Sequence, residues 1–197
     1  MKELDARGLQ CPKPLMMAQK GLDGCDTLVV KVSNEAAVSN LSHLAKRFGR
    51  SFSPEQQQDY WDVTIGGLPE GATPEESVPC ECLVKEPYAV FVGKDHVGEG
   101  DETLGKSLMK MALYTLSESD NPPAHLLFMN SGVKLVAGGE QAVVDSVSSL
   151  VAQGTEVLVC GTCLDYYGLK DQLAVGEVSN MYDILGRMQE SSKTITL

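Results

Sequence analysis

A cysteine followed by two prolines stands near the start of the chain, in Cys11-Pro12-Lys13-Pro14. A residue before proline avoids the α region and proline favours the first helical position, so we expect Cys11 at the N-cap of a helix that begins at Pro12. Prolines lack N–H groups, which leaves the N–H groups of Lys13 and Leu15 facing the thiol. The helix terminus and the Lys13 ammonium would stabilise a thiolate. The motif therefore predicts that Cys11 is a nucleophile with a modestly lowered pKa.

A second pair of thiols, Cys160 and Cys163, follows the apolar run at 155–159. Cys-x-x-Cys at a strand-to-helix junction has the spacing of a redox pair with a lowered thiol pKa. In a relay, Cys160 would accept a persulfide and Cys163 would resolve it. The pair could also form half of a zinc site completed by Cys80 and Cys82. Alternatively, both could be plain buried cysteines at a strand end. The sequence leaves these four interpretations open.

The other cysteines and the histidines carry weaker signals. Acidic neighbours would raise the pKa of Cys80 and Cys82, and Cys25 lies in a turn without a basic neighbour. The histidines share no ligand spacing. His96 follows a predicted strand, from which it could approach Cys160, but a solvated loop histidine is the preferred interpretation.

Residues 100–107 match the phosphate-binding pattern G-x-x-x-x-G-K-S. A phosphate loop follows its strand directly, whereas here the preceding strand is expected to end near Val92, about seven residues before Gly100. Asp101 and Glu102 would also put negative charge where phosphate should lie, and they suit the start of a helix. We therefore interpret the match as a coincidence, with Lys106 inside a helix.

The elements expected to position these residues fall into two groups. In the first group, apolar periodicity and β-branched runs predict the order βαβαββ, a small two-layer α+β sandwich. Its elements are strand 2–7, helix 12–21, strand 27–33, a helix from Asn34 through Phe48, and strands 50–53 and 60–65.

The second group alternates strands and helices, which favours an α/β layer domain with a parallel sheet. Its elements are strand 88–92, helix 101–116, strand 126–129, helix 140–151, strand 156–160, helix 177–190 and strand 194–197. Reactive groups in such sheets gather at the carboxyl ends of strands, where Cys160 stands.

The segment between the groups is rich in Pro, Gly and acidic residues, so it is interpreted as a linker. The predicted organisation is therefore a domain at 1–67, a linker at 68–87 and a domain at 88–197. Formal net charge is −11 over 197 residues, and these three segments carry 0, −4 and −7. Such a distribution has no basic footprint for nucleic acid.

Two further expectations concern location. No apolar run approaches the roughly 18 residues of a membrane helix, and the first residues have no apolar segment typical of a signal peptide. We therefore expect a cytoplasmic protein with no membrane partner, in which the six cysteines are reduced thiols.

Residues 4–16, Leu-Asp-Ala-Arg-Gly-Leu-Gln-Cys-Pro-Lys-Pro-Leu-Met, resemble the signature of the TusA-like (SirA-like) sulfur carriers. The resemblance covers about residues 1–67 and fits the βαβαββ order. It implies that Cys11 receives sulfur as a persulfide and passes it on. Gly8 would permit a tight turn near the thiol, and Pro12 and Pro14 would shape the helix start.

The second half resembles DsrE-like proteins of sulfur relay, through the cysteine that ends the strand at 155–160, a small-residue loop and a late helix at 176–188. Together the halves look like the YedF family, which is associated with selenium metabolism. The segment 160–169, Cys-Gly-Thr-Cys-Leu-Asp-Tyr-Tyr-Gly-Leu, looks like that family's C-terminal hallmark.

The resemblance implies a sulfur or selenium carrier in which Cys11 holds a persulfide or selenopersulfide and Cys160, with Cys163, is a second station. No separate cofactor or metal is expected, since the cargo is covalent. Partners would be a cysteine desulfurase or other donor and acceptor proteins, and sulfurtransferase activity stays open. The alternative is a redox-regulated binding or regulatory module whose DsrE-like domain mainly oligomerises.

Overall fold

The computed structural model describes residues 1–10, 12–22, 25–67 and 86–197. These residues fall into two compact units, one on each side of residues 68–85, and each is described by itself. The proposed linker at 68–87 thus lies outside the described residues except for its last two. One of these, Pro87, accepts a hydrogen bond from the backbone N–H of Ser192 at 2.9 Å, so it is held by the second unit.

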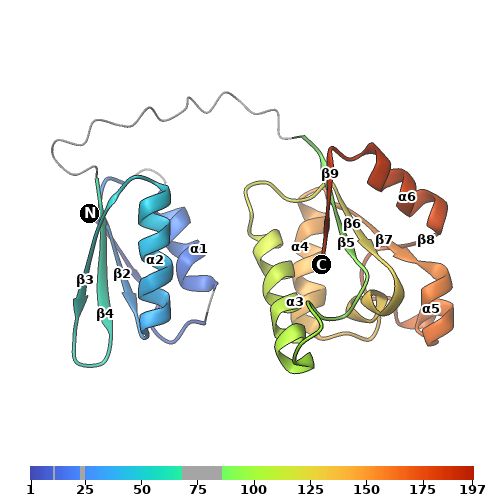
Figure 1. Cartoon of the computed structure of the whole chain (residues 1–197), viewed down its shortest axis with the longest axis horizontal. Coiled ribbons are helices and arrows are strands. Elements are labelled where there is room, and N and C mark those ends of the chain that lie inside the picture. The colour runs from blue at the N-terminus through green and yellow to red at the C-terminus, as the bar shows by residue number, and fades with distance from the viewer. Residues whose placement is uncertain (11, 23–24, 68–85) are drawn as a thin grey trace. The chain divides into compact units, whose positions relative to one another are not determined.

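The N-terminal unit is a four-stranded sheet in the order β1-β2-β4-β3, with helices α1 and α2 on one face (Figure 1). Its elements are β1 (Lys2–Asp5), α1 (Lys13–Leu22), β2 (Leu28–Val32), α2 (Glu35–Arg47), β3 (Ser51–Gln56) and β4 (Trp61–Gly66). Strands β1 and β2 are parallel and the other pairs antiparallel. The predicted βαβαββ sandwich is confirmed.

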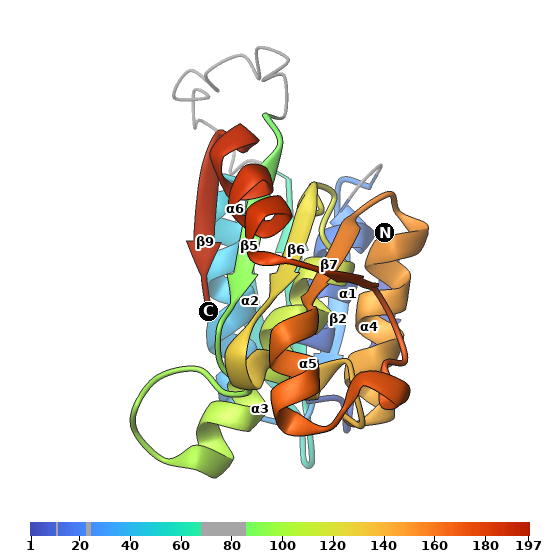
Figure 2. The same cartoon turned by 90° about the vertical axis from the view of Figure 1, so that its right-hand side faces the viewer.

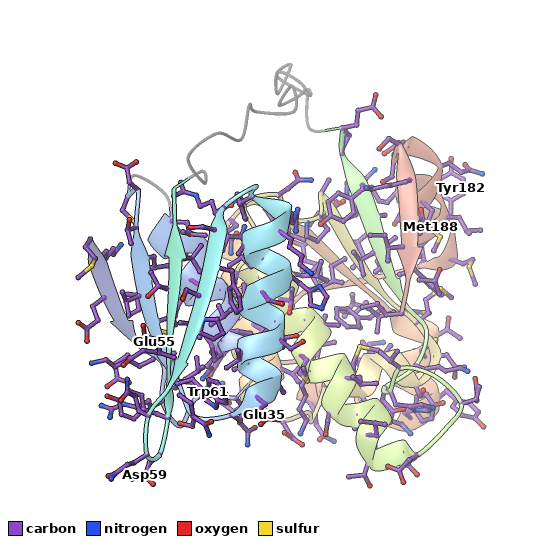
Figure 3. The ribbon with its side chains drawn as sticks, turned by 60° about the vertical axis from the view of Figure 1, so that its left-hand side comes forward. Glu35, Glu55, Asp59, Trp61, Tyr182 and Met188 are labelled. Atoms are coloured by element: carbon purple, nitrogen blue, oxygen red, sulfur yellow. The ribbon has the colours of Figure 1, made fainter. Side chains whose placement is uncertain are left out.

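Side-chain alternation explains why helices cover only one face of this sheet. Val30 and Val32 of β2 and Val63 and Ile65 of β4 are fully buried against the helices, while their neighbours face away from them. The β3–β4 hairpin projects beyond the helices, with Asp59 at its tip (Figure 3).

The C-terminal unit is a five-stranded sheet in the order β8-β7-β6-β5-β9, and every neighbouring pair is parallel. Its elements are β5 (Tyr88–Val92), α3 (Glu102–Ser117), β6 (His125–Phe128), α4 (Gln141–Ala152), β7 (Glu156–Cys160), α5 (Gly161–Tyr167), β8 (Glu177–Ser179), α6 (Met181–Glu190) and β9 (Lys193–Thr196), with short 3-10 turns at Asn130–Leu135 and Lys170–Gln172. The predicted parallel-sheet layer domain is confirmed.

Helices cover both faces of this sheet, α3 and α4 on one side and α6 on the other (Figures 1 and 2). The larger core lies under α3 and α4 and contains Val90, Leu126 and Val157. The alternate residues Ala89, Leu127 and Leu158 form a smaller core with Cys160 and with Ile184 of α6.

Two predicted elements of this unit were wrong. The residues after Cys160 form helix α5 at once, where a loop of small residues was expected. The helix expected at 177–190 is divided: Glu177–Ser179 form edge strand β8, and α6 starts at Met181 with Asn180 as its N-cap. Pairing with β7 at 158–160 draws these residues into the sheet, and periodicity along one segment cannot reveal such pairing.

The residues of the phosphate-loop pattern have the expected structure. Asp101 caps α3, its carboxylate accepting from the N–H of Leu104 at 2.8 Å. Lys106 lies within the helix and forms an ion pair with Glu102 at 2.6 Å. Within the described ranges, no helix combines the length and the apolar character needed to cross a membrane.

Candidate functional site

Cys11 itself lies outside the described residues, so its neighbours define what is known of the first candidate site. Gly8 adopts a φ of 73°, in the left-handed region that favours glycine. Its N–H donates to the hydroxyl of Ser33 at 2.9 Å, which ties the segment before the motif to the end of β2. The expected turn at Gly8 is therefore present.

Helix α1 starts differently from the expectation. It begins at Lys13, and the N–H of Lys13 donates to the carbonyl of Gln10 at 3.1 Å. This bond occupies one of the two donors that were expected to face a thiol at residue 11. Pro14 is buried and Pro12 is half-buried, whereas Lys13 is exposed. The prolines thus pack the helix start against the domain while the cation faces solvent.

A small groove, open to solvent, lies beside the segments that flank residue 11. It is lined by the starts of both helices, through Leu9, Pro14, Leu15, Asn34, Ala36, Ala37 and Asn40. Asn34 caps α2, its side chain accepting from the N–H of Ala37 at 2.8 Å. The groove is mainly apolar, which suits contact with part of a partner's surface.

The second candidate site lies at the carboxyl end of β7. Cys160 is the last residue of that strand and also the N-cap residue of α5. Only 3% of Cys160 is exposed, because it packs with Leu127 and Ile184 in the smaller core. Cys163, one turn into α5, is half-buried and contacts both cores. Both thiols are free, and Cys163 packs against the cluster that holds Cys160.

The loop after β6 supplies the other contacts of Cys163. The N–H of Asn130 donates to the Cys163 sulfur at 3.1 Å. The side-chain oxygen of Asn130 accepts from the hydroxyl of Tyr167 at 3.0 Å, and the Lys134 ammonium lies 4.3 Å from the centre of the Tyr167 ring. Asn130 has a φ of 49°, a conformation that asparagine tolerates better than most residues. The loop and α5 are thus clamped together around Cys163.

The pKa of the Cys163 thiol is raised above its ordinary value. Burial is the main cause, and the neighbouring Cys160 thiol adds to it, while the Asn130 N–H opposes the rise. The lowered pKa expected for this pair is therefore wrong for Cys163. Burial therefore favours the protonated thiol of Cys163 over its thiolate.

The loop after β5 reaches the same edge of the sheet. His96 bonds to Asp95 at 2.9 Å, and Asp95 accepts from Ser131, beside Asn130, at 3.4 Å. Burial by itself would raise the pKa of Asp95. Its hydrogen bonds, of which the one with His96 has the largest effect, outweigh burial and lower the pKa. His96 is thus paired with its neighbouring carboxylate, and no bond to Cys160 was found for it within the described residues.

Zinc gains no support from this site. Over the residues that the structure describes, no three His, Cys, Asp or Glu side chains are grouped to hold a metal ion. Cys80 and Cys82, which that interpretation requires, lie outside the described residues. Cys25 is half-buried and donates to the carbonyl of Gly21 at 2.9 Å, a local bond that leaves it without a catalytic partner among those residues.

Sequence reasoning missed Asn130 and Tyr167. Asn130 lies two residues after the end of strand β6. Its position near the carboxyl end of a parallel strand was the signal that could have identified it as a site residue. Tyr167 stands four residues after Cys163, a spacing that would have pointed to one face of a helix had α5 been expected.

Comparison with known proteins divides the chain in the same way. Residues 2–67 match the family described as sulfurtransferase TusA, and residues 95–197 match the DsrE/DsrF-like family. Among curated proteins no match was found.

Two solved structures are similar to parts of the chain. A SirA-like protein from Desulfitobacterium hafniense is 30% identical and matches over its whole length, covering 35% of this chain with a TM-score of 0.33. The ychN protein from E. coli is 20% identical, with 99% of that protein and 56% of this chain covered and a TM-score of 0.45.

Proposed function

Because the chain belongs to the DsrE/DsrF-like family and also carries a TusA domain, which together indicate a role in sulfur relay, we propose that it is a cysteine-based carrier of sulfur or selenium. Cys11 holds the cargo as a persulfide or selenopersulfide. The pair Cys160 and Cys163 is the second station. The protein acts stoichiometrically, and its donor is a cysteine desulfurase or another persulfide protein.

One observation carries the proposal: the motif Cys11-Pro12-Lys13-Pro14 lies within the residues that match the sulfurtransferase TusA family. The surrounding structure supports it. Gly8 holds the preceding turn, Pro14 packs into the domain, and exposed Lys13 supplies a cation beside the motif. A cation near a thiol favours the thiolate, which is the form that attacks a sulfane sulfur.

Three further parts of the proposal rest on sequence resemblance and composition. The combination of the two domains resembles the YedF family, which favours selenium as a second cargo. Cytoplasmic location follows from the need to keep the cysteines reduced. Acceptor proteins would approach the groove lined by Leu9, Pro14 and Leu15, which lies beside residue 11.

The test is intact mass after incubation of the full chain with a cysteine desulfurase and cysteine. We expect the mass of one sulfur atom to be added at Cys11 and to be lost in Cys11→Ser. Cys25→Ser is the matched control, since Cys25 lies in the same domain and its thiol donates to the carbonyl of Gly21 at the end of α1. Loading that persists in Cys11→Ser, or no loading at all, contradicts the assignment. A repeat with selenide decides between the cargoes.

A regulatory module that assembles through its DsrE-like domain is the second candidate, and exposed apolar side chains favour it. Met181, Tyr182 and Leu185 of α6, with Val178 of β8, are between 46% and 85% exposed. Tyr182 stands on the outer side of α6, whereas Met188 packs toward the sheet (Figure 3). Sedimentation of the full chain and of Tyr182→Glu tests this candidate. Unchanged monomers in both samples would contradict it.

A further inference from the structure

The two thiols of the second site differ in how far they can be reached. Cys160 is 3% exposed and enclosed by Leu127, Leu158 and Ile184, so a protein or small-molecule persulfide cannot approach it directly. Cys163 is half-buried and reaches the surface. The first sulfur transfer from outside must therefore go to Cys163, the reverse of the order expected from the sequence.

The position of Cys160 suits attack on sulfur held at Cys163. An N-cap side chain and the third residue of the helix lie on the same side of the first turn, the geometry that also brings capping side chains to that position. Here Cys163 packs against the buried cluster that contains Cys160. The N–H of Asn130, 3.1 Å from the Cys163 sulfur, holds that atom in place.

From this geometry we propose that the site is a persulfide reductase, in which Cys163 accepts a sulfane sulfur and buried Cys160 expels it as hydrosulfide. The inference uses the proposed function only for the identity of the natural donor. Its substrate class is a protein or low-molecular-weight persulfide, and a selenopersulfide would release hydroselenide in the same way.

The reaction has three balanced steps. First, the Cys163 thiolate attacks the outer sulfur of the donor, R–S–SH, giving Cys163–S–SH and the donor thiolate. Second, Cys160 gives up its proton and its thiolate attacks the inner sulfur of Cys163–S–SH, which forms the Cys160–Cys163 disulfide and releases HS⁻. Two thiol sulfurs are oxidised and the sulfane sulfur is reduced. Third, an external dithiol reductant returns the disulfide to two thiols.

The half-buried position of Cys163, which raises the pKa of its thiol, favours one of two outcomes of the second step. If Cys160 attacked the outer sulfur, the sulfur would move to Cys160 and the Cys163 thiolate would leave. A thiol with a raised pKa is a poor leaving group in such exchange. Attack on the inner sulfur instead expels hydrosulfide into solvent. The same burial that slows sulfur transfer to Cys163 therefore favours release of hydrosulfide over transfer of the sulfur to Cys160.

The test uses glutathione persulfide as the probe and the full chain with Cys11, Cys80 and Cys82 replaced by serine. Loading through Cys11 is then not required, so failure here is distinguishable from failure of the proposed function. We expect one equivalent of sulfide per chain, together with loss of the mass of two hydrogen atoms from the peptide that contains both cysteines. A sample without protein gives the background.

Single replacements then assign the two roles. Cys160→Ala and Cys160→Ser should keep a persulfide on Cys163 and release sulfide only at background, while Cys163→Ser should neither load nor release. Cys25→Ser should match the parent, and thermal unfolding establishes that each variant is folded. Release that continues in folded Cys160→Ala, or a persulfide found on Cys160 in folded Cys163→Ser, overturns the proposal. A parent that accumulates a stable Cys163 persulfide without a disulfide also overturns it.

Discussion

Gly132 allows the loop that carries Asn130 to lie directly against the end of β5. A Cβ added at Gly132 would be 2.3 Å from the carbonyl oxygen of Val92 and 3.0 Å from its carbonyl carbon. Ordinary contact begins at 3.4 Å, so the loop would have to move by about 1 Å. The same carbonyl accepts from the N–H of Met129 at 3.0 Å, and this bond would be strained as well.

These contacts set the expected magnitude for Gly132→Ala. Overpacking costs about 1–3 kcal/mol, and a weakened buried hydrogen bond adds about 1 kcal/mol. Loss of glycine's freedom in the unfolded chain returns about 0.4–1 kcal/mol. We expect a net loss of about 2 kcal/mol, which lowers Tm by roughly 8 °C at about 4 °C per kcal/mol for a domain of this size.

The assay separates the two domains within the full chain. Trp61, the chain's single tryptophan, lies in β4, so its fluorescence follows unfolding of the N-terminal domain. Circular dichroism follows both domains. Gly132→Ala should lower the C-terminal transition and leave the Trp61 midpoint unchanged. Loosening of the loop should also expose Cys163 and speed its alkylation, because burial is the main cause of its raised pKa.

Gly186→Ala is the matched control, since a Cβ at Gly186 meets nothing within 4 Å and the residue lies in α6. There the same substitution should stabilise by about 0.5–1 kcal/mol through helix propensity. Equal stability of the two variants, or a fall in the Trp61 midpoint in Gly132→Ala, would refute the reasoning.

Three other predictions concern stability, organisation and ligand binding. The pKa of Glu156 is lowered, mainly by the hydrogen bond from Arg187. The carboxylate therefore stabilises the fold at pH values above the pKa that Glu156 has in the unfolded chain, and this stabilisation is lost as the pH falls through the lowered pKa of the folded state. Glu156→Gln should therefore be less stable at pH 7 and flatter in acid-unfolding curves, and an unchanged acid transition contradicts this. We propose residues 68–87 as an interdomain linker, because their composition cannot form a core: limited proteolysis should cut there first, and earlier cuts inside either domain would move the boundary. Millimolar ATP with Mg²⁺ should not raise Tm, since Lys106 is paired with Glu102 inside α3; a rise that disappears in Lys106→Ala would restore the phosphate-loop interpretation.

Local signals in the sequence predicted most of the fold. Asn34 and Asp101 were expected at the starts of helices, and in the structure both accept the capping hydrogen bond. The apolar runs at 88–92 and 156–160 became strands with those bounds. The proposed roles of Cys11, Cys160 and Cys163 still await the loading experiments.

Tertiary structure decided what neighbours along the chain cannot encode. The sequence marked Cys160 and Cys163 as a pair, but packing of α6 against the sheet determines that Cys160 is buried and Cys163 reachable. Asn130 is 33 residues from Cys163, and only the parallel order of β6 and β7 brings its N–H to that sulfur. Strand β8 likewise exists because β7 offers an edge for pairing. Residue types thus determined which atoms could react, whereas burial and strand order determined which of them partners can reach, because both depend on contacts between distant segments.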